Sequence, residues 1–216
     1  AGLLHRVFPH RFYIERHPNF FSFFDKVVNY RTDQRHAVLF VEFCIFKFPF
    51  TGDKDFYRLE ANASYYVPLR YNGVIALSGR AGMVDAYGDS QKVPIFERYF
   101  AGGAQSIRGY SERSVGPIDA NTGDAIGGEA ILVASVEYTI PLVEVIKLAT
   151  FFDIGNVWSQ SADFGKNDLY SGYGIGFRVK TPIGPMKLDY GIPLDKEPGE
   201  DSKKDGKFYF SVSRGF

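Results

Sequence analysis

Arg108 is the residue whose type and setting point most clearly to a chemical role, and it lies in a glycine-rich stretch at residues 94–117. The sequence around it, SIRGY at 106–110, follows the paired glycines Gly102 and Gly103. Glycines at this density allow sharp bends and close backbone approaches at low steric cost. A guanidinium held at such a bend can bind a carboxylate through two parallel hydrogen bonds. The alternative is a glycine-rich surface loop that contains an arginine by chance.

Catalysis and metal binding have no comparable signal in the sequence. The histidines all lie within residues 1–36, and the spacing of His5, His10 and His17 fits no metal-ligand pattern. They are far in sequence from any motif, so no Ser/His/Asp set is recognisable. The single cysteine, Cys44, excludes an internal disulfide and a multi-thiolate zinc site. We therefore expect no enzyme activity, metal or cofactor, and the zero formal net charge gives no reason to expect a nucleic-acid partner.

Alternating apolar and polar residues indicate that most of the chain after residue 35 is built from β-strands. In residues 130–140, for example, Leu132 and Val136 fall on one face, and Ser135 and Glu137 fall on the other. A period of two residues is the mark of a strand whose two faces differ. The sequence predicts eight strands, at 36–48, 55–68, 73–84, 127–140, 144–158, 168–181, 185–193 and 206–216.

The connections between these strands favour a membrane barrel over a soluble sandwich. Short turns such as 141–143 and 182–184 alternate with longer polar loops, of which 84–126 is the longest. This asymmetry is typical of outer-membrane barrels, and the strands are about as long as a tilted strand needs to be to cross a bilayer. We therefore predict an all-β, antiparallel transmembrane β-barrel whose loop 84–126 lies outside the cell. The residues predicted to face lipid are Leu132, Phe152, Ile175, Phe177 and Phe210.

The predicted barrel domain spans residues 35–216, and residues 1–34 form an N-terminal segment that is harder to interpret. This segment could add one or two strands, cross the periplasmic side or fill the lumen. The chain would then contribute eight to ten strands.

Several motifs resemble, in order, those of the BamA/TamA-type outer-membrane assembly proteins, also called the bacterial surface-antigen barrel family. The resemblance covers roughly residues 30–216. It rests on SIRGY at 106–110, ASVEY at 134–138, FFDIGNVW at 151–158, GIGFR at 174–178, TPIGP at 181–185, LDYG at 188–191 and the terminal Phe216. It implies a protein of a Gram-negative-type outer membrane, with an organelle outer membrane as the less favoured location.

The resemblance also implies a site where the loop is bound inside the barrel. In the family, the arginine at the loop tip pairs with carboxylates on the inner wall. By motif, this corresponds to Arg108 with Glu137 and Asp153, beside Gly109 and Tyr110. The strand alternation independently places both acids on the polar face. The alternative is that the two acids pair with the other basic residues of that face, Arg178 or Lys180.

Two further sets of residues belong to the predicted site. Gly172, Gly174 and Gly176 share the inner face of one strand with Arg178, where they mark a bend in the sheet or leave room for the loop. The aromatic residues near the end of the chain resemble the signal by which barrel substrates are recognised for assembly. These are Phe208, Phe210 and Phe216, on the strand that forms the seam of the barrel.

The family relationship suggests two functions. The first is insertion or assembly of outer-membrane proteins, or translocation, in which a weakly sealed seam templates incoming strands by β-augmentation. Its partners would be the lipid bilayer, unfolded outer-membrane proteins and, as further candidates, accessory lipoproteins. The second is an anchor or exporter for a secreted passenger such as a patatin-like lipase. A third possibility, an enzyme within the barrel, has little support.

The chain departs from the family in its size. The family barrel has sixteen strands and follows periplasmic modules, whereas a closed barrel of eight strands would be filled by its own side chains. The chain would therefore be part of a longer protein, half of a barrel completed by a second chain, or a small barrel capped by its loop. We expect that the strand at 36–48 does not pair with the strand at 207–216.

Overall fold

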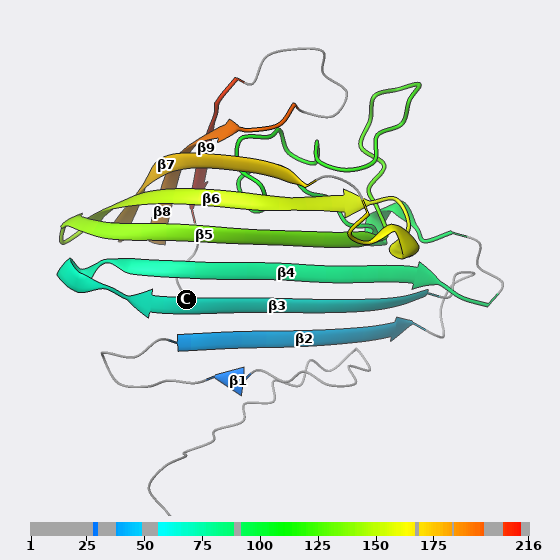
Figure 1. Ribbon diagram of the computed structural model, residues 1–216, viewed down its shortest axis with the longest axis horizontal. Helices are drawn as coiled ribbons and strands as arrows, with labels where there is room; N and C mark the ends of the chain where they lie inside the picture. The colour runs from blue at the N-terminus through cyan, green and yellow to red at the C-terminus, as the bar shows by residue number, and fades with distance from the viewer. Residues whose placement is uncertain are drawn as a thin grey trace, which may run out of the picture.

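In the computed structural model, the chain forms one antiparallel β-sheet, with a long loop packed on one of its faces (Figure 1). The structure describes the backbone of residues 28–29, 38–48, 56–88, 92–166, 169–182, 184–196 and 205–212. Side chains are described within these ranges from residue 56 onward. None of the helices in these ranges is long and apolar enough to cross a membrane.

In the part of the chain that the structure describes, nine strands follow one another across the sheet in chain order, each paired with its sequence neighbours. They are β1 (Val28–Asn29), β2 (Val38–Phe48), β3 (Phe56–Pro68), β4 (Val74–Ala86), β5 (Ala130–Val143), β6 (Ile146–Trp158), β7 (Tyr170–Thr181), β8 (Gly184–Pro193) and β9 (Lys207–Val212). The described parts of the connections contain three short 3₁₀ helices: η1 (Arg70–Asn72), η2 (Ile95–Glu97) and η3 (Ser161–Asp163). The predicted all-β antiparallel fold is confirmed, and the nine strands lie within the predicted range of eight to ten.

The sheet is open among the described residues, since its strand order runs from β1 to β9 and β9 pairs with β8 alone. The described strands therefore do not close on themselves, which is consistent with part of a barrel wall. Strand β1 lies in the segment 1–34, whose other residues fall outside the described ranges, as does Phe216.

Two predicted connections begin or end elsewhere in the structure. The turn expected at 141–143 is part of β5, and the chain turns at Glu144 and Val145 instead. The reason is a register shift between Pro141 and Val143, after which the ladder to β6 continues. The long loop runs from 87 to 129, because β4 extends to Ala86 by pairing with Phe56 of β3.

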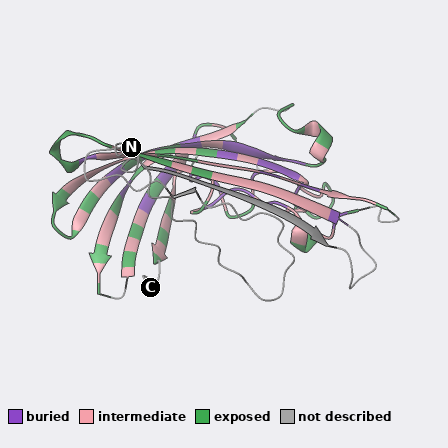
Figure 2. Cartoon of the chain, turned by 90° about the horizontal axis from the view of Figure 1, so that it is seen from below, coloured by how far each residue is buried: buried purple, intermediate pink, exposed green. Residues whose placement is uncertain are grey.

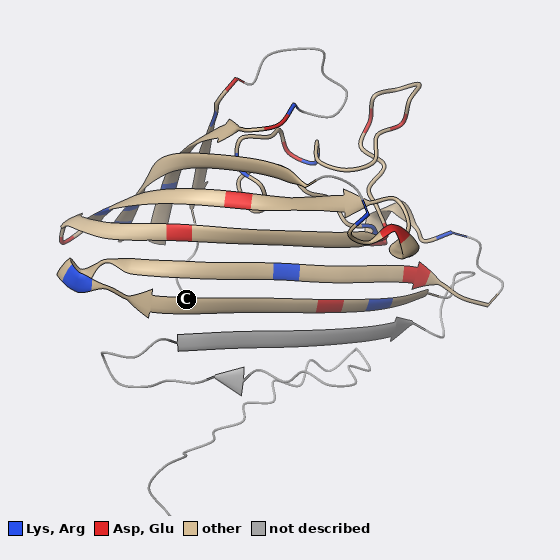
Figure 3. Cartoon of the chain, viewed as in Figure 1, with Lys and Arg blue, Asp and Glu red and all other residues tan. Residues whose placement is uncertain are grey.

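Burial alternates along the strands, as Figure 2 shows by its bands of colour. On β6, Phe151 and Asp153 are buried while Phe152 between them is exposed. Ile175, Phe177 and Phe210 are exposed on the same outer face, and Leu132 is half-buried there. Charged residues are sparse along the middle strands (Figure 3). The sheet thus has an apolar outer face and an inner face that carries the polar groups.

The buried apolar core lies between the loop and the inner face of the sheet. Its members come from the loop, from the adjoining parts of β3 and β4, and from β5 and β6. They are Phe56, Val84, Val93, Tyr99, Ala101, Ile107, Tyr110, Val115, Ile131, Val133 and Val157. Burial of this apolar surface is the main force that holds the loop on the wall. The loop is therefore an integral part of the fold.

Candidate functional site

The loop reaches the inner wall at Gly109, whose backbone lies against the end of β8. Its φ of +107° favours glycine. A Cβ at this position would lie 2.7 Å from the backbone nitrogen of Pro193 and 2.9 Å from the carbonyl carbon of Ile192. Any larger residue would therefore push the loop tip away from the wall.

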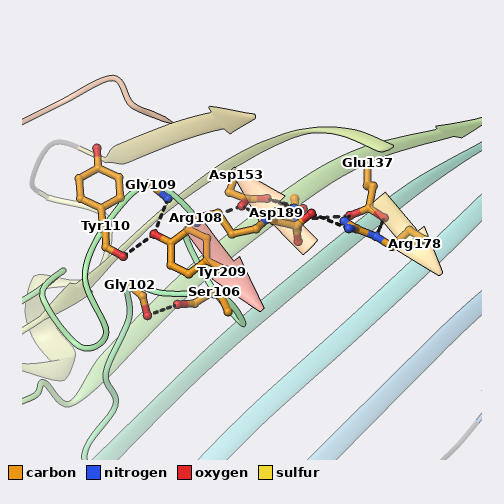
Figure 4. Close-up of polar contacts among 12 residues, drawn as sticks. Gly102, Ser106, Arg108, Gly109, Tyr110, Glu137, Asp153, Arg178, Asp189 and Tyr209 are labelled. Atoms are coloured by element: carbon orange, nitrogen blue, oxygen red, sulfur yellow. Dashed lines mark hydrogen bonds and ion pairs between the residues drawn. The ribbon is translucent and has the colours of Figure 1, made fainter. Parts of the chain in front are cut away.

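Arg108, next to this glycine, binds the carboxylate of Asp153 on β6 (Figure 4). The guanidinium donates from Nε to Oδ2 at 2.7 Å and from Nη2 to Oδ1 at 2.8 Å. The backbone N–H of Arg108 donates a third bond to Oδ2 at 3.1 Å. Asp153 is fully buried, and its Oδ1 also accepts a bond of 2.6 Å from the hydroxyl of Ser135. Every polar atom of this carboxylate is therefore satisfied by the loop and the neighbouring strand.

Two more carboxylates and a second guanidinium complete the site. Arg108 Nη1 lies 3.0 Å from Glu137 Oε2 on β5 and 3.3 Å from Asp189 Oδ2 on β8. Arg178 on β7 binds the same two acids, with 2.7 Å between its Nη2 and Glu137 Oε2. We call Arg108, Glu137, Asp153, Arg178 and Asp189 the arginine cluster. Glu137 thus pairs with both arginines, so the two alternatives considered from the sequence coexist at this residue.

The chemistry of the arginine cluster is charge pairing in a buried setting. Arg108 is only 7 % exposed. Burial alone would lower the pKa of Arg108, but the hydrogen bonds and charges of Asp153 and Glu137 outweigh burial and raise it, so the guanidinium stays charged. Its carbon also lies 3.4 Å from the ring centroid of Phe151, in a cation–π contact. Removing one partner from such a site leaves a buried charge uncompensated, which is strongly destabilising.

Tyr110 lies beside the cluster and is fully buried. Its hydroxyl donates to the carbonyl of Ser171 at 2.8 Å and accepts from the backbone N–H of Asp195 at 3.2 Å. Its ring meets that of Tyr170 edge-on at 5.9 Å. Burial raises the pKa of Tyr110 to about 12. The loop tip is thus attached on both sides of Gly109.

The three glycines of β7 make room for different groups. A Cβ at Gly172 would overlap the carbonyl oxygen of Arg108, so this glycine lies directly beneath the loop tip. A Cβ at Gly174 would overlap the ring of Phe151, and one at Gly176 would overlap the carboxylate of Asp189. Only the first of the three accommodates the loop itself, and the other two accommodate groups of the wall, which at Gly174 include the backbone carbonyl of Tyr190.

A second group of charges attaches the start of the loop to β3 and β4. The Arg58 guanidinium lies 4.4 Å from the ring centroid of Tyr99 and donates to the Glu97 carbonyl at 3.2 Å. Glu60 accepts from Arg58 at 3.2 Å and from Arg80 at 2.9 Å. The hydroxyl of Tyr99 donates to the carbonyl of Leu59 at 3.3 Å. Sequence reasoning missed this attachment, although the strand alternation places Arg58 and Glu60 on one face.

The last strand also contacts the loop tip. The hydroxyl of Tyr209 on β9 accepts from the Gly109 N–H at 2.8 Å and donates to the Tyr110 carbonyl at 2.7 Å. Phe208 and Phe210 point to the outer face, where they are 67 % and 56 % exposed. Sequence reasoning missed Tyr209 as well as Asp189, and for both residues the strand alternation was the available signal.

No group of His, Cys, Asp or Glu within the described ranges has the arrangement of a metal site. The arginine cluster holds its carboxylates by guanidinium groups instead.

Comparison with known proteins gives a consistent family. A family model described as the Omp85 superfamily domain matches residues 37–216. The outer membrane protein assembly factor BamA of Nitratidesulfovibrio vulgaris is 36 % identical over 172 residues, which cover 78 % of this chain and 21 % of that protein. BamA of Neisseria meningitidis is 28 % identical over 193 residues, covering 74 % of this chain and 24 % of that protein.

A solved structure shares the fold. The crystal structure of BamA from Haemophilus ducreyi lacking POTRA domains 1–3 has a TM-score of 0.64 and 25 % sequence identity to this chain. The match covers 86 % of this chain and 41 % of that one. The chain thus spans about a fifth to a quarter of the length of the curated relatives that it matches.

Proposed function

Because the chain belongs to the Omp85 superfamily, we propose that it is the barrel portion of an outer-membrane protein that inserts or assembles other β-barrel proteins. It acts without enzymatic catalysis, through the hydrogen-bonding groups of strand edges. Its substrates are unfolded outer-membrane proteins, and the bilayer is its second partner. The apolar outer face, with Phe152, Ile175 and Phe177 exposed, suits contact with lipid.

The observation that carries this proposal is the loop bound across the inner wall by the arginine cluster. Glu137 lies on β5, Asp153 on β6 and Asp189 on β8, so Arg108 bridges strands on both sides of β7. A wall braced in this way keeps its curvature while strands at its edge change partners. The edge strand of a sheet presents the N–H and C=O groups with which an incoming strand can pair. The loop 87–129 lies at the extracellular side under this proposal.

The test is insertion of an unfolded model β-barrel protein into liposomes that contain the full-length protein. The wild type is expected to speed insertion over empty liposomes, and Arg108→Ala to lose most of this effect. Arg70→Ala is the matched control, since Arg70 is an exposed arginine in the turn η1 and should leave insertion unchanged.

The competing function is an anchor or exporter for a passenger domain. Wild-type liposomes that insert no faster than empty ones would contradict assembly. Release of a fused passenger to the far side of the membrane would then support export.

A further inference from the structure

The loop tip and the last strand are joined by one side chain, that of Tyr209. Its hydroxyl lies between two consecutive peptide groups of the loop, accepting from the Gly109 N–H at 2.8 Å and donating to the Tyr110 carbonyl at 2.7 Å. The hydroxyl therefore acts both as an acceptor and as a donor towards the loop backbone. Lys207, two residues earlier on the same face of β9, binds the hydroxyl of Ser111. The last strand thus holds three consecutive loop residues, of which Gly109 and Tyr110 are seen beside Tyr209 in Figure 4.

Among the described strands, β9 pairs with β8 alone. Its ladder to β8 has six residue pairs, from Met186 opposite Val212 to Gly191 opposite Lys207. The inner strands β5 to β8 each pair on both sides, whereas β9 has no described strand on its other side. A strand held by a single ladder opens more readily than one paired on both sides, so bonds outside the ladder matter more for β9.

The Tyr209 bonds also connect β9 to the arginine cluster. Tyr209 lies directly opposite Asp189 in the ladder, and Asp189 binds both Arg108 and Arg178. Gly191 on β8 lies against the backbone of Gly109, where a Cβ would approach the loop nitrogen to 2.6 Å. A continuous set of bonds and contacts therefore runs from the charges on β6 through the loop tip to β9.

We propose that Tyr209 couples the docking of the loop tip to the pairing of the last strand. While the tip is docked, Tyr209 holds β9 on the wall, and when the tip lifts, β9 is free to separate from β8. The coupling is reciprocal, because each bound state stabilises the other by the same free energy. Tyr209 is a positioning residue, and the consequence for strand exchange at the β9 edge rests on the proposed function.

The direct test is hydrogen exchange of backbone amides in the full-length protein in lipid nanodiscs, comparing wild type with Tyr209→Phe. Phenylalanine keeps the ring and removes both hydroxyl bonds. We expect the amides of residues 207–212 and 106–111 to exchange about ten-fold faster, with β5 and β6 unchanged. Tyr173→Phe is the matched control, since Tyr173 is exposed on the outer face of β7. Unchanged exchange of β9 in Tyr209→Phe would overturn the proposal.

A double-mutant comparison separates coupling from simple loss of packing. Arg108→Ala, which releases the tip, should speed exchange of β9 in the wild-type background. In the Tyr209→Phe background it should add little, because the connection is already broken. Independent, additive effects of the two substitutions would contradict the coupling.

The same variants keep this inference distinct from the proposed function. If coupling is present and wild-type liposomes fail to insert substrate, assembly is refuted and the coupling stands. If the wild type inserts substrate and exchange of β9 does not depend on Tyr209, the coupling is refuted and assembly stands. With both correct, Tyr209→Phe is expected to raise the initial insertion rate, because the β9 edge opens more often while the ion pairs of Arg108, which Arg108→Ala removes, still brace the wall.

Discussion

Arg108 and Asp153 are 45 residues apart in the sequence, yet three hydrogen bonds join them, two from the guanidinium and one from the backbone N–H of the arginine. The side chain of Asp153 is fully buried and that of Arg108 nearly so. A carboxylate in this position has no access to water, so its charge depends on the loop for compensation. Docking of the loop therefore supplies the charged partner that the buried Asp153 side chain needs.

The first prediction concerns the two arginine substitutions at this pair. Arg108→Ala should lower the free energy of unfolding by about 3–5 kcal/mol, because it leaves buried carboxylates uncompensated. Arg108→Lys should recover part of this loss, since an ammonium group keeps the charge but lacks the bidentate fork. Urea unfolding followed by heat-modifiable gel mobility measures both. Equal stability of Arg108→Ala and the exposed control Arg70→Ala would contradict the prediction.

The second prediction concerns the glycine beneath the loop tip. Gly172→Ala should displace the tip, because the added Cβ overlaps the Arg108 carbonyl, at a cost of about 1–3 kcal/mol. Gly79→Ala is the matched control on β4, where the added Cβ would meet only the Val133 carbonyl at 3.9 Å. Limited trypsin digestion should cleave the loop faster in Gly172→Ala alone. Equal cleavage of the two variants would show that the tip does not rest on this glycine.

The third prediction concerns Asp189, the member of the arginine cluster that the sequence did not assign to the site. Asp189→Asn keeps the shape of the side chain but removes a charge that both arginines contact. We expect a loss of about 1.5–3 kcal/mol in the free energy of unfolding, typical of a hydrogen bond to a charged group. The control Asp163→Asn removes an exposed partner of Lys166 and should change stability by less than about 1 kcal/mol. If Asp189→Asn leaves the free energy of unfolding unchanged, the charges of Glu137 and Asp153 are sufficient to stabilise the two arginines.

The fourth prediction is a pH dependence of loop docking. Burial raises the pKa of Tyr110 from 10.0 to about 12, so the folded state holds this proton more tightly than the unfolded state. The stabilisation is fully present below pH 10 and is lost as the pH rises towards 12. Protease accessibility of the loop should therefore increase over this range. Tyr110→Phe should remove much of this increase, and an identical profile in the variant would assign it to other groups.

The fifth prediction concerns the orientation of the sheet in the membrane. Single cysteines at Ile175 or Phe177, introduced after replacing Cys44 by Ser, should carry spin labels that are accessible to oxygen and shielded from water-soluble quenchers. A label at Lys187, on the opposite face of β8, should show the reverse pattern. An inverted result would require a register error of one residue, which exchanges the two faces of a strand.

The sequence by itself determined the strands and their two faces. Successive side chains of a strand point to opposite faces of the sheet, so the period of two can be recognised from a short stretch of sequence. It correctly placed Phe152 on the outer face and Asp153 on the inner face. It also placed Glu137, Asp189 and Tyr209 on the polar face. The local pattern predicted the strand ends less well. A turn was expected at 141–143, but these residues continue β5 through a register shift that depends on pairing with β6.

Only the tertiary structure decided which polar residues meet. Gly109 and Tyr209 are 100 residues apart, and Arg108 and Asp189 are 81 apart, so their contacts depend on the registers of β5 to β9 taken together. The path of the loop is set by burial of its apolar residues against β3 to β6, which no local pattern encodes. The alternation indicates which side chains face inward. The distance between two inward-facing groups depends on the register of every strand pair and on every bend of the chain between them.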